Sequence, residues 1–475
     1  MNAVRSIISN TAARTFTEIL NRLGSAVFWI LIARKLGVSG LGSIAFAMSL
    51  FALFSSISTL GLGTVVIRDV ARDRDRAGQY FGQLLKLGLL LSVLFAALMI
   101  VVVFIIHPNP DSSYAAMAMA FALIPASGFY WSKSILSAAE KMGYIAVART
   151  AENVFKVGIG LVLLMSGAGI REMVLVFMLS KVVSFVICYS YAVDRIAQPV
   201  WHTDFSLFRY LLKQAPSFSL ITVFNGLFWS LAVIMLTAIK GEAEAGLFSA
   251  AFKLVELCIA VSLAYGQAFF PVVSRFAYKD EKMFVNLSKK SIKYITMVTI
   301  AVAAGTTVMA PQIITLIYGA NMTAAVPVLR ISIWLVIPFG VIPVLAYSLI
   351  SRNMQKLDLL ANIAAAGVVL IANLVLLHFM GTPGTAVAML LAGLVFFAVE
   401  FYWVTKKLYK MTISLQSLNP VMGAIIMSFA VFLLKDTLIF IPIITGALLY
   451  ILYLWISRTL TQMDINYLRQ LGSVR

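Results

Sequence analysis

The chain has 475 residues, of which 61% are hydrophobic and only 12% are charged. Soluble domains contain roughly 45–50% apolar and about 25% charged residues, so this composition excludes a soluble globular protein and indicates a polytopic membrane protein. The net charge of +18 would suggest nucleic-acid binding in a soluble protein. In a membrane protein it follows from basic cytoplasmic loops, so we expect membrane lipids and no nucleic acid as partners.

The N-terminal residues do not resemble a cleavable signal peptide, because the small residues Thr11, Ala12 and Ala13 precede the apolar run. We expect a short lead into the first membrane helix. Windows of about 20 apolar residues then predict fourteen membrane-spanning helices. The windows lie near residues 14–36, 40–64, 80–106, 113–136, 144–166, 170–193, 211–238, 245–273, 291–317, 325–350, 358–379, 383–405, 418–434 and 438–457.

The basic residues of the loops predict the orientation. Loops on one side contain many Lys and Arg residues, including Arg68–Arg76, Arg275–Lys290 and Lys406–Lys410. Loops on the other side contain few, among them Lys240 and Lys435. Because cytoplasmic loops are enriched in Lys and Arg, both termini are predicted to be cytoplasmic, in a multi-pass protein of the cell inner (plasma) membrane.

A short motif occurs twice. Residues 40–46 read GLGSIAF and residues 246–252 read GLFSAAF, a spacing of 206, while LVLL recurs at 161–164 and 374–377, a spacing of 213. Both spacings match one set of six predicted helices. Six is an even number, so the copies are predicted to have the same orientation. We therefore expect six-helix bundles at 1–200 and 201–410, followed at 411–475 by two further helices and a cytoplasmic tail.

Several charged residues fall inside predicted spans. A charge in mid-membrane costs roughly 2.5–3.5 kcal/mol even on the lower insertion scales, so these side chains should face a wet or protein-lined interior. Lys181 has no acid within two turns on its own helix. The candidates for an interior site are the cations Arg22, Arg149, Lys156, Lys181 and Lys253 and the acids Glu18, Glu152 and Glu256.

Two interpretations of these charges are open. In the structural one, Glu18–Arg22, Glu152–Lys156 and Lys253–Glu256 are same-helix ion pairs that neutralise each other. In the functional one, the cations form a net-positive cavity for an anionic group, for which phosphate is the natural partner. Lys181 favours the functional interpretation.

The second half of the chain contains fewer deep charges and more amides and aromatic residues. Such side chains suit sugar hydroxyls and sugar faces, and the alternative is ordinary hydrogen bonding between helices. The candidates for sugar contact are Asn225, Trp229, Gln267, Asn362 and Asn373.

The sequence contains no motif of a catalytic or cofactor site. It lacks GxxxxGK[ST], GxGxxG, HExxH and GxSxG, and its His and Cys residues have no metal-ligand spacing. The loops are also short. We therefore expect neither an enzyme nor a bound metal or cofactor.

Two segments resemble a known family. Residues 31–72, LIARKLGVSGLGSIAFAMSLFALFSSISTLGLGTVVIRDVAR, look like the opening of the polysaccharide transporter branch of the MOP flippase superfamily, which includes Wzx-type O-antigen flippases. Residues 245–277 resemble the corresponding helix of the second repeat. The resemblance implies an all-α membrane fold with two six-helix bundles in a V-shaped, MATE-like arrangement and alternating access to a central cavity. Arg22 and Lys253 are similar in position to cavity cations of related flippases.

The resemblance also implies a function. The expected substrate is a polyprenyl pyrophosphate-linked oligosaccharide, moved to the outer leaflet for O-antigen, capsule or exopolysaccharide synthesis by a monomer, with a polysaccharide polymerase as a further partner. Glu18, Glu152 and Glu256 are candidates for ion coupling. The alternatives are a peptidoglycan-precursor (lipid II) flippase, a MATE-type cation-coupled multidrug antiporter and, least favoured, a membrane enzyme. The antiporter is disfavoured because a site for cationic drugs should be net acidic.

Overall fold

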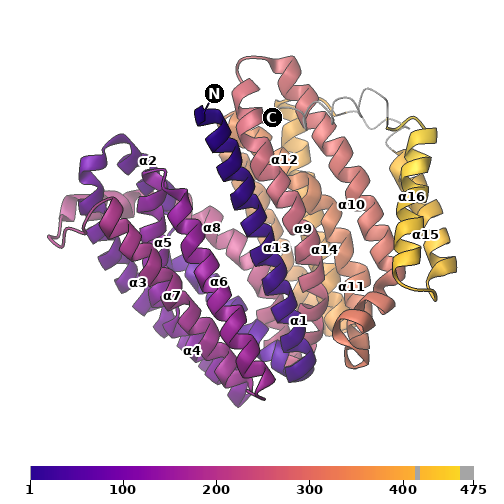
Figure 1. The fold of residues 1–475 in the computed structure, drawn as a ribbon, viewed down its shortest axis with the longest axis horizontal. Helices are drawn as coiled ribbons and strands as arrows, with labels where there is room; N and C mark the ends of the chain where they lie inside the picture. Colours follow the sequence, from indigo (N-terminus) through magenta and orange to yellow (C-terminus); the bar gives the residue numbers. More distant parts are fainter. Residues whose placement is uncertain (1, 412–417, 461–475) are drawn as a thin grey trace. The chain divides into compact units, whose positions relative to one another are not determined.

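The computed structural model describes residues 2–411 and 418–460, without the side chains of residues 2–20, 22, 23 and 216–218. The described part is helical and contains no strand, which confirms the all-α prediction. Figure 1 shows its helices. Their bounds are α1 Asn2–Ser58, α2 Gly63–Arg72, η1 Arg74–Arg76, α3 Ala77–Ile106, α4 Pro110–Phe121, α5 Leu123–Ala138, α6 Met142–Met165, α7 Ile170–Arg195, α8 Phe205–Lys240, α9 Glu242–Phe276, α10 Glu281–Tyr318, η2 Ala320–Ala325, α11 Val326–Ser332, η3 Ile333–Leu335, α12 Val336–Ser351, α13 Gln355–Met380, α14 Thr382–Lys407, α15 Asn419–Leu434 and α16 Phe440–Ile456.

The chain forms two compact units, Met1–Ser249 and Ala250–Arg475, which are described separately. In the first unit, Gly37 divides the long helix α1 with a φ of 72°, a conformation that glycine adopts without steric cost. The first predicted span and most of the second therefore lie in one helix with a break between them, and this helix ends at Ser58. The predicted domain limits at residues 200 and 410 stay predictions.

The core of the first unit lies among α2, α3, α5 and α7. Trp131 and Phe81 are fully buried there. The segment that connects α7 to α8 is bound to α3, because the Val200 amide donates to the Gly78 carbonyl at 2.9 Å and the Gln83 amide donates to the His202 carbonyl at 2.7 Å. The link between the predicted halves is therefore fixed along α3.

The two copies of the repeated motif contribute to one helix crossing within the first unit. A Cβ on Gly42 of α1 would lie 1.8 Å from the Glu242 carbonyl oxygen, and a Cβ on Gly246 of α9 would lie 1.9 Å from the Val38 carbonyl oxygen. Real Cβ atoms do not approach so closely. Glycine is therefore required on both helices for the backbones to pass at this distance.

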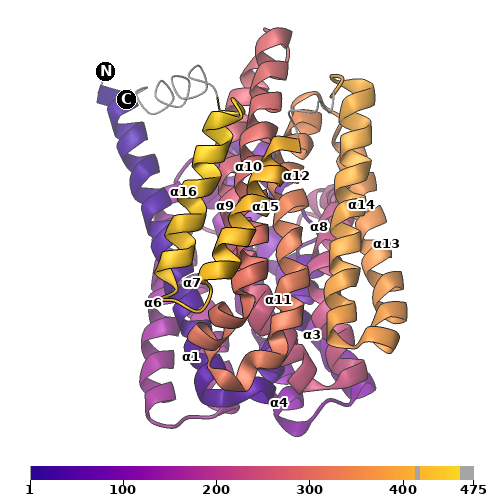
Figure 2. The same ribbon diagram turned by 90° about the vertical axis from the view of Figure 1, so that its right-hand side faces the viewer.

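The second unit is built around α10, α12, α13 and α14. The helices α13 and α14 form an antiparallel pair, and α12 packs against both. The pair α15–α16 packs on α10, where the Tyr450 hydroxyl donates to the Met297 carbonyl at 2.8 Å. Figure 2 shows both helix pairs. The two C-terminal helices are therefore an attachment to α10 within this unit.

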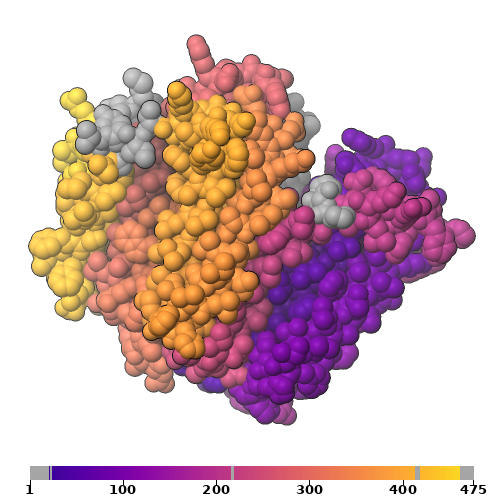
Figure 3. All heavy atoms as spheres, turned by 180° about the vertical axis from the view of Figure 1, so that it is seen from behind, coloured from indigo at the N-terminus to yellow at the C-terminus, as the bar shows by residue number. Residues whose placement is uncertain are grey.

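Ten helical segments of the described residues are long and apolar enough to cross a membrane, and α15 and α16 are shorter apolar helices. Two differences from the fourteen predicted spans are clear. The segment Gly24–Ser58 counts once where two spans were predicted, and α6 is not among the ten. These segments make the chain a multi-pass membrane protein, and the number fourteen stays a prediction. Apolar side chains such as Leu374 and Leu391 are exposed on α13 and α14, which form the orange surface of the second unit in Figure 3. Such a surface suits contact with lipid.

Candidate functional site

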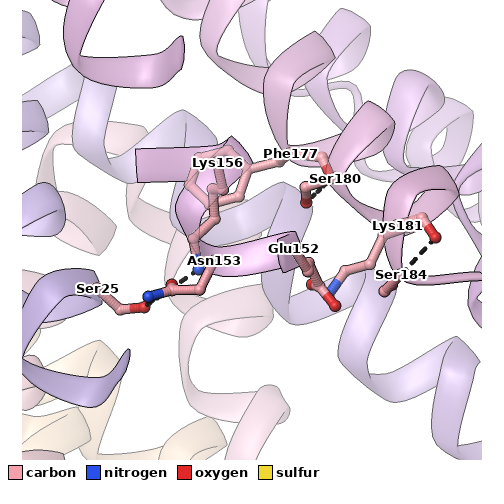
Figure 4. A network of polar contacts seen from close by, with 8 residues as sticks. All are labelled: Ser25, Glu152, Asn153, Lys156, Phe177, Ser180, Lys181 and Ser184. Carbon is pink, nitrogen blue, oxygen red and sulfur yellow. Dashed lines mark hydrogen bonds and ion pairs between the residues drawn. The ribbon is translucent and has the colours of Figure 1, made fainter. Parts of the chain in front are cut away.

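The site begins with an ion pair between two neighbouring helices of the first unit. The Lys181 Nζ on α7 donates to the Glu152 Oε1 on α6 at 2.6 Å, with the side chains 23% and 16% exposed. Figure 4 shows the two side chains pointing toward each other. Lys181 has no acid within two turns on its own helix, as the sequence indicated, but it pairs with an acid on the adjacent helix. Glu152 pairs with Lys181 and not with Lys156, so the same-helix pair of the structural interpretation does not form here. Periodicity along one helix could not show that the acid lies on the adjacent helix.

A polar network that begins at the next residue of α6 joins this helix to α1. The Ser25 hydroxyl donates to the Asn153 Oδ1 at 2.6 Å, and the Asn153 Nδ2 donates to the backbone and side-chain oxygens of Asn21 at 3.1 and 3.2 Å. The Lys156 Nζ donates to the Ser25 hydroxyl at 3.2 Å, in the region drawn in Figure 4. The network therefore fixes Lys156 at the α1–α6 interface.

Two further cations lie in this part of the first unit. Arg149 is exposed on α6, and Lys133 on α5 is close enough to Arg149 for the two charges to repel. Besides its ion pair with Glu152, the Lys181 ammonium lies 5.6 Å from the centre of the Phe51 ring of α1. Sequence reasoning missed Lys133, although a lysine inside the predicted span 113–136 was a signal that could have identified it.

The described side chains of this cluster carry more positive than negative charge. Among the described side chains on α5, α6 and α7, the cluster contains four cations, Lys133, Arg149, Lys156 and Lys181, and one carboxylate, Glu152. We call these five residues the cationic cluster. Because interior cations are stabilised by anionic groups, a net-positive cluster of this kind favours an anionic ligand.

The other predicted charges lie elsewhere. The side chains of Glu18 and Arg22 are outside the described part, so their predicted pairing is untested. In the second unit, the Lys253 Nζ donates to the Glu256 Oε2 at 2.6 Å, which confirms this same-helix pair. A role for Lys253 and Glu256 beyond this pair stays a prediction.

The five candidates for sugar contact differ in exposure. Asn225 and Gln267 are exposed, and Trp229 is half-buried against Phe228. Asn225 and Trp229 are on α8, which packs against α1, so they belong to the first unit with the cationic cluster.

Asn362 and Asn373 differ from these three. Both are buried, and each side-chain amide donates at 3.0 Å to a carbonyl of its own helix, that of Asp358 or Val369. These bonds fall within one helix, unlike the predicted interhelical alternative. Sugar contact by any of the five residues stays a prediction.

The structure also contains a carboxyl pair that sequence reasoning missed. Asp358 on α13 and Glu400 on α14 are both buried in the second unit. The signal was available for Glu400, which stands alone in the apolar run of the predicted span 383–405. Within the described residues, no group of three or more His, Cys, Asp or Glu side chains is arranged to hold a metal ion.

The fold is that of a class of membrane transporters. A solved structure of the lipid II flippase MurJ in an inward closed conformation superposes with a TM-score of 0.82 at 15% identity, covering 95% of this chain and all of that one. An inward-facing multidrug resistance MATE transporter of the MOP superfamily gives 0.66 at 16% identity, over 82% and 94% of the two chains. The chain therefore has the all-helical fold of MOP-superfamily transporters.

The sequence comparisons define the family. The polysaccharide biosynthesis protein family matches residues 5–277, more than half of the 475 residues, so the chain belongs to this family. It is also 23% identical over 393 residues to the probable low-salt glycan biosynthesis flippase Agl15 of Haloferax volcanii, covering 82% of this chain and 80% of the relative. The predicted family is confirmed.

Proposed function

We propose that this protein is a flippase that moves a polyprenyl pyrophosphate-linked oligosaccharide from the cytoplasmic to the outer leaflet of the cell membrane. The product would serve the synthesis of a cell-surface polysaccharide such as O-antigen, capsule or exopolysaccharide. Family membership and the name of the Haloferax relative support the class of substrate. The cationic cluster carries the proposal, because it contains more positive than negative side chains among the described residues.

The pyrophosphate that joins the lipid to the sugar is the part of the substrate that the cluster would bind. Phosphate oxygens accept charge-assisted hydrogen bonds from Lys and Arg. Lys181 already donates to the carboxylate of Glu152 at 2.6 Å, so its ammonium is oriented toward an oxyanion before substrate arrives. A phosphate oxygen would replace Glu152 as the acceptor, and Glu152 would then be released from its partner.

The remaining predictions concern the transport cycle. Alternating access between the bundles predicted at 1–200 and 201–410 would expose the site to each side in turn, with both termini cytoplasmic and a monomer as the working unit. Asn225, Trp229 and Gln267, which are not fully buried, are the preferred sugar contacts, and Glu18, Glu152 and Glu256 are candidates for ion coupling. A polysaccharide polymerase would act on the exported product.

The test is a flipping assay in vesicles that contain the purified protein and a fluorescent polyprenyl pyrophosphate oligosaccharide. The fraction of lipid that an impermeant quencher reaches measures translocation. Lys156→Glu and Lys181→Glu should lower the rate by at least about tenfold, since a lost interaction of about 1.4 kcal/mol corresponds to that factor. Lys282→Glu, at an exposed site in the first turn of α10, is the matched control. Undiminished flipping by both folded cluster variants would contradict the proposal.

Lipid II flipping is the alternative that the fold favours, because the MurJ structure covers 95% of this chain. Its cargo also has a polyprenyl pyrophosphate, so the cationic cluster does not distinguish the two. Competition in the same assay distinguishes the two cargoes. An excess of unlabelled lipid II should slow oligosaccharide flipping only if both cargoes use the site. A multidrug antiporter would be indicated by cation-driven drug uptake into these vesicles.

A further inference from the structure

Two carboxyl groups face each other inside the second unit. Glu400 on α14 is fully buried, at 0% exposure, and Asp358 on α13 is 9% exposed. The two helices pack along their lengths (Figure 2), and the side chains lie within hydrogen-bonding reach of each other. Neither carboxyl oxygen of Glu400 has a donor in the described structure. The Glu400 side chain is therefore buried without a partner and directed at a second acid.

The neighbouring helices do not supply a compensating cation. In the described part of the chain, neither carboxyl group forms an ion pair with a Lys or Arg. The basic groups of the surrounding elements are directed elsewhere or exposed, and the Tyr347 hydroxyl of α12 is the other titratable group that interacts with Asp358. These basic groups are Arg352 over the Tyr278 and Phe284 rings, Lys406 over the Tyr402 and Trp403 rings, and the exposed Lys356, Lys407 and Arg330.

Chemistry limits the states of such a pair. An ionised carboxylate is only an acceptor, so two ionised groups cannot bond to each other. A buried charge without a partner is also strongly unfavourable, and two like charges add repulsion. One proton removes both difficulties, because a protonated carboxyl donates to its neighbour and the pair then carries a single charge.

We propose that Asp358 and Glu400 form a proton-binding site in which the two carboxyl groups share one proton. Asp358 is in the first turn of α13 and Glu400 is about two turns before the end of α14, so the site lies near the predicted cytoplasmic end of this hairpin. Release and uptake of the proton at this end would couple a proton gradient to conformational change. The coupling of the proton gradient to conformational change rests on the proposed flippase function, whereas the proton site itself does not.

Infrared spectroscopy of the purified full chain tests the site directly, because a protonated carboxyl absorbs separately from a carboxylate. At neutral pH the native protein should show a protonated carboxyl band that shifts in deuterated water. Glu400→Gln, which keeps size and removes the acid, should abolish the band, because Asp358 can then ionise and accept from the new amide. Asp358→Asn should keep the band at a changed frequency, because the fully buried Glu400 stays protonated beside an amide. The exposed Glu281→Gln is the control and should retain it. A band that survives Glu400→Gln, is unaltered by Asp358→Asn, or is absent from the native protein would overturn the proposal.

Two further measurements separate the possible outcomes. If sodium raises the melting temperature of the native protein and Glu400→Gln abolishes this effect, the pair is a sodium site and the proton proposal is wrong. In the vesicle assay, Glu400→Gln should flip substrate at a rate that no longer responds to a pH gradient. An unchanged response of this variant would remove the coupling. If the native protein does not flip the substrate, the flippase proposal fails while the infrared result stands.

Discussion

Lys181 on α7 and Glu152 on α6 form a 2.6 Å ion pair between adjacent helices in the interior of the first unit. Glu152 is the carboxylate among the described members of the cationic cluster, so the pair bears on the anion binding proposed for that cluster. Lys181 stabilises the α6–α7 contact through this pair, and its binding of an anion is a proposal.

Charge exchange should distinguish these roles. Glu152→Lys and Lys181→Glu should each lower the free energy of unfolding by about 1–3 kcal/mol, because each leaves a partly buried charge opposite a like charge. The double variant restores an ion pair and should regain most of this stability, with an interaction energy of about 0.5–3 kcal/mol. Unfolding of the four proteins in mixed detergent micelles measures this. Purely additive losses would show that the pair does not stabilise the fold.

The contact between α1 and α6 depends on Asn153. Asn153→Leu removes the hydrogen bonds to Ser25 and Asn21. Because each interhelical hydrogen bond in a membrane contributes about 0.6 kcal/mol or somewhat more, this substitution should lower the free energy of unfolding by about 1–2 kcal/mol. Val154→Leu, at an exposed neighbouring position, should leave stability unchanged. Equal effects of the two substitutions would exclude a role for the network.

The helix crossing at Gly42 predicts opposite signs for two glycine substitutions. Gly42→Ala should destabilise the protein by about 1–3 kcal/mol, because its Cβ would overlap the Glu242 carbonyl oxygen 1.8 Å away. Gly158→Ala, on α6 with no atom within 4 Å of the added Cβ, should stabilise it by up to about 1 kcal/mol through helix propensity. Melting temperatures of both variants provide the measurement. An unchanged melting temperature of Gly42→Ala would mean that α1 and α9 can move apart here without loss of stability.

The start of α8 should respond to acid. The Asp204 carboxylate accepts bonds from the Ser206 hydroxyl and from the Leu207 and Ser206 amides, and these bonds lower the pKa of Asp204 from its ordinary value of 3.8. Because the folded pKa is depressed, this contribution to stability is complete above pH 3.8 and is lost as the pH falls through the folded pKa. Hydrogen exchange of the first amides of α8 should accelerate over that acid range.

Two variants complete this test. Asp204→Asn should keep the cap and remove the acid dependence, since Asn is an equally good N-cap residue. Asp204→Ala should show rapid exchange at every pH. Acid-dependent protection in Asp204→Asn would place the titrating group elsewhere.

The sequence by itself determined the class of the protein and the approximate positions of its helices. Hydropathy and charge are local properties of a segment, so a span such as 144–166 closely predicts the helix Met142–Met165. The same locality explains the confirmed pair Lys253–Glu256, because residues three apart on one helix are neighbours whatever surrounds it.

Only the tertiary structure decided the partner of each deep charge that pairs between helices. Lys181 and Glu152 are 29 residues apart, and their contact depends on the rotation of α6 and α7 about their axes, which many apolar side chains set together. Asp358 and Glu400 meet for the same reason across the α13–α14 hairpin. Sequence periodicity shows that a helix has a charged face, but the packing of the neighbouring helices determines which group that face meets.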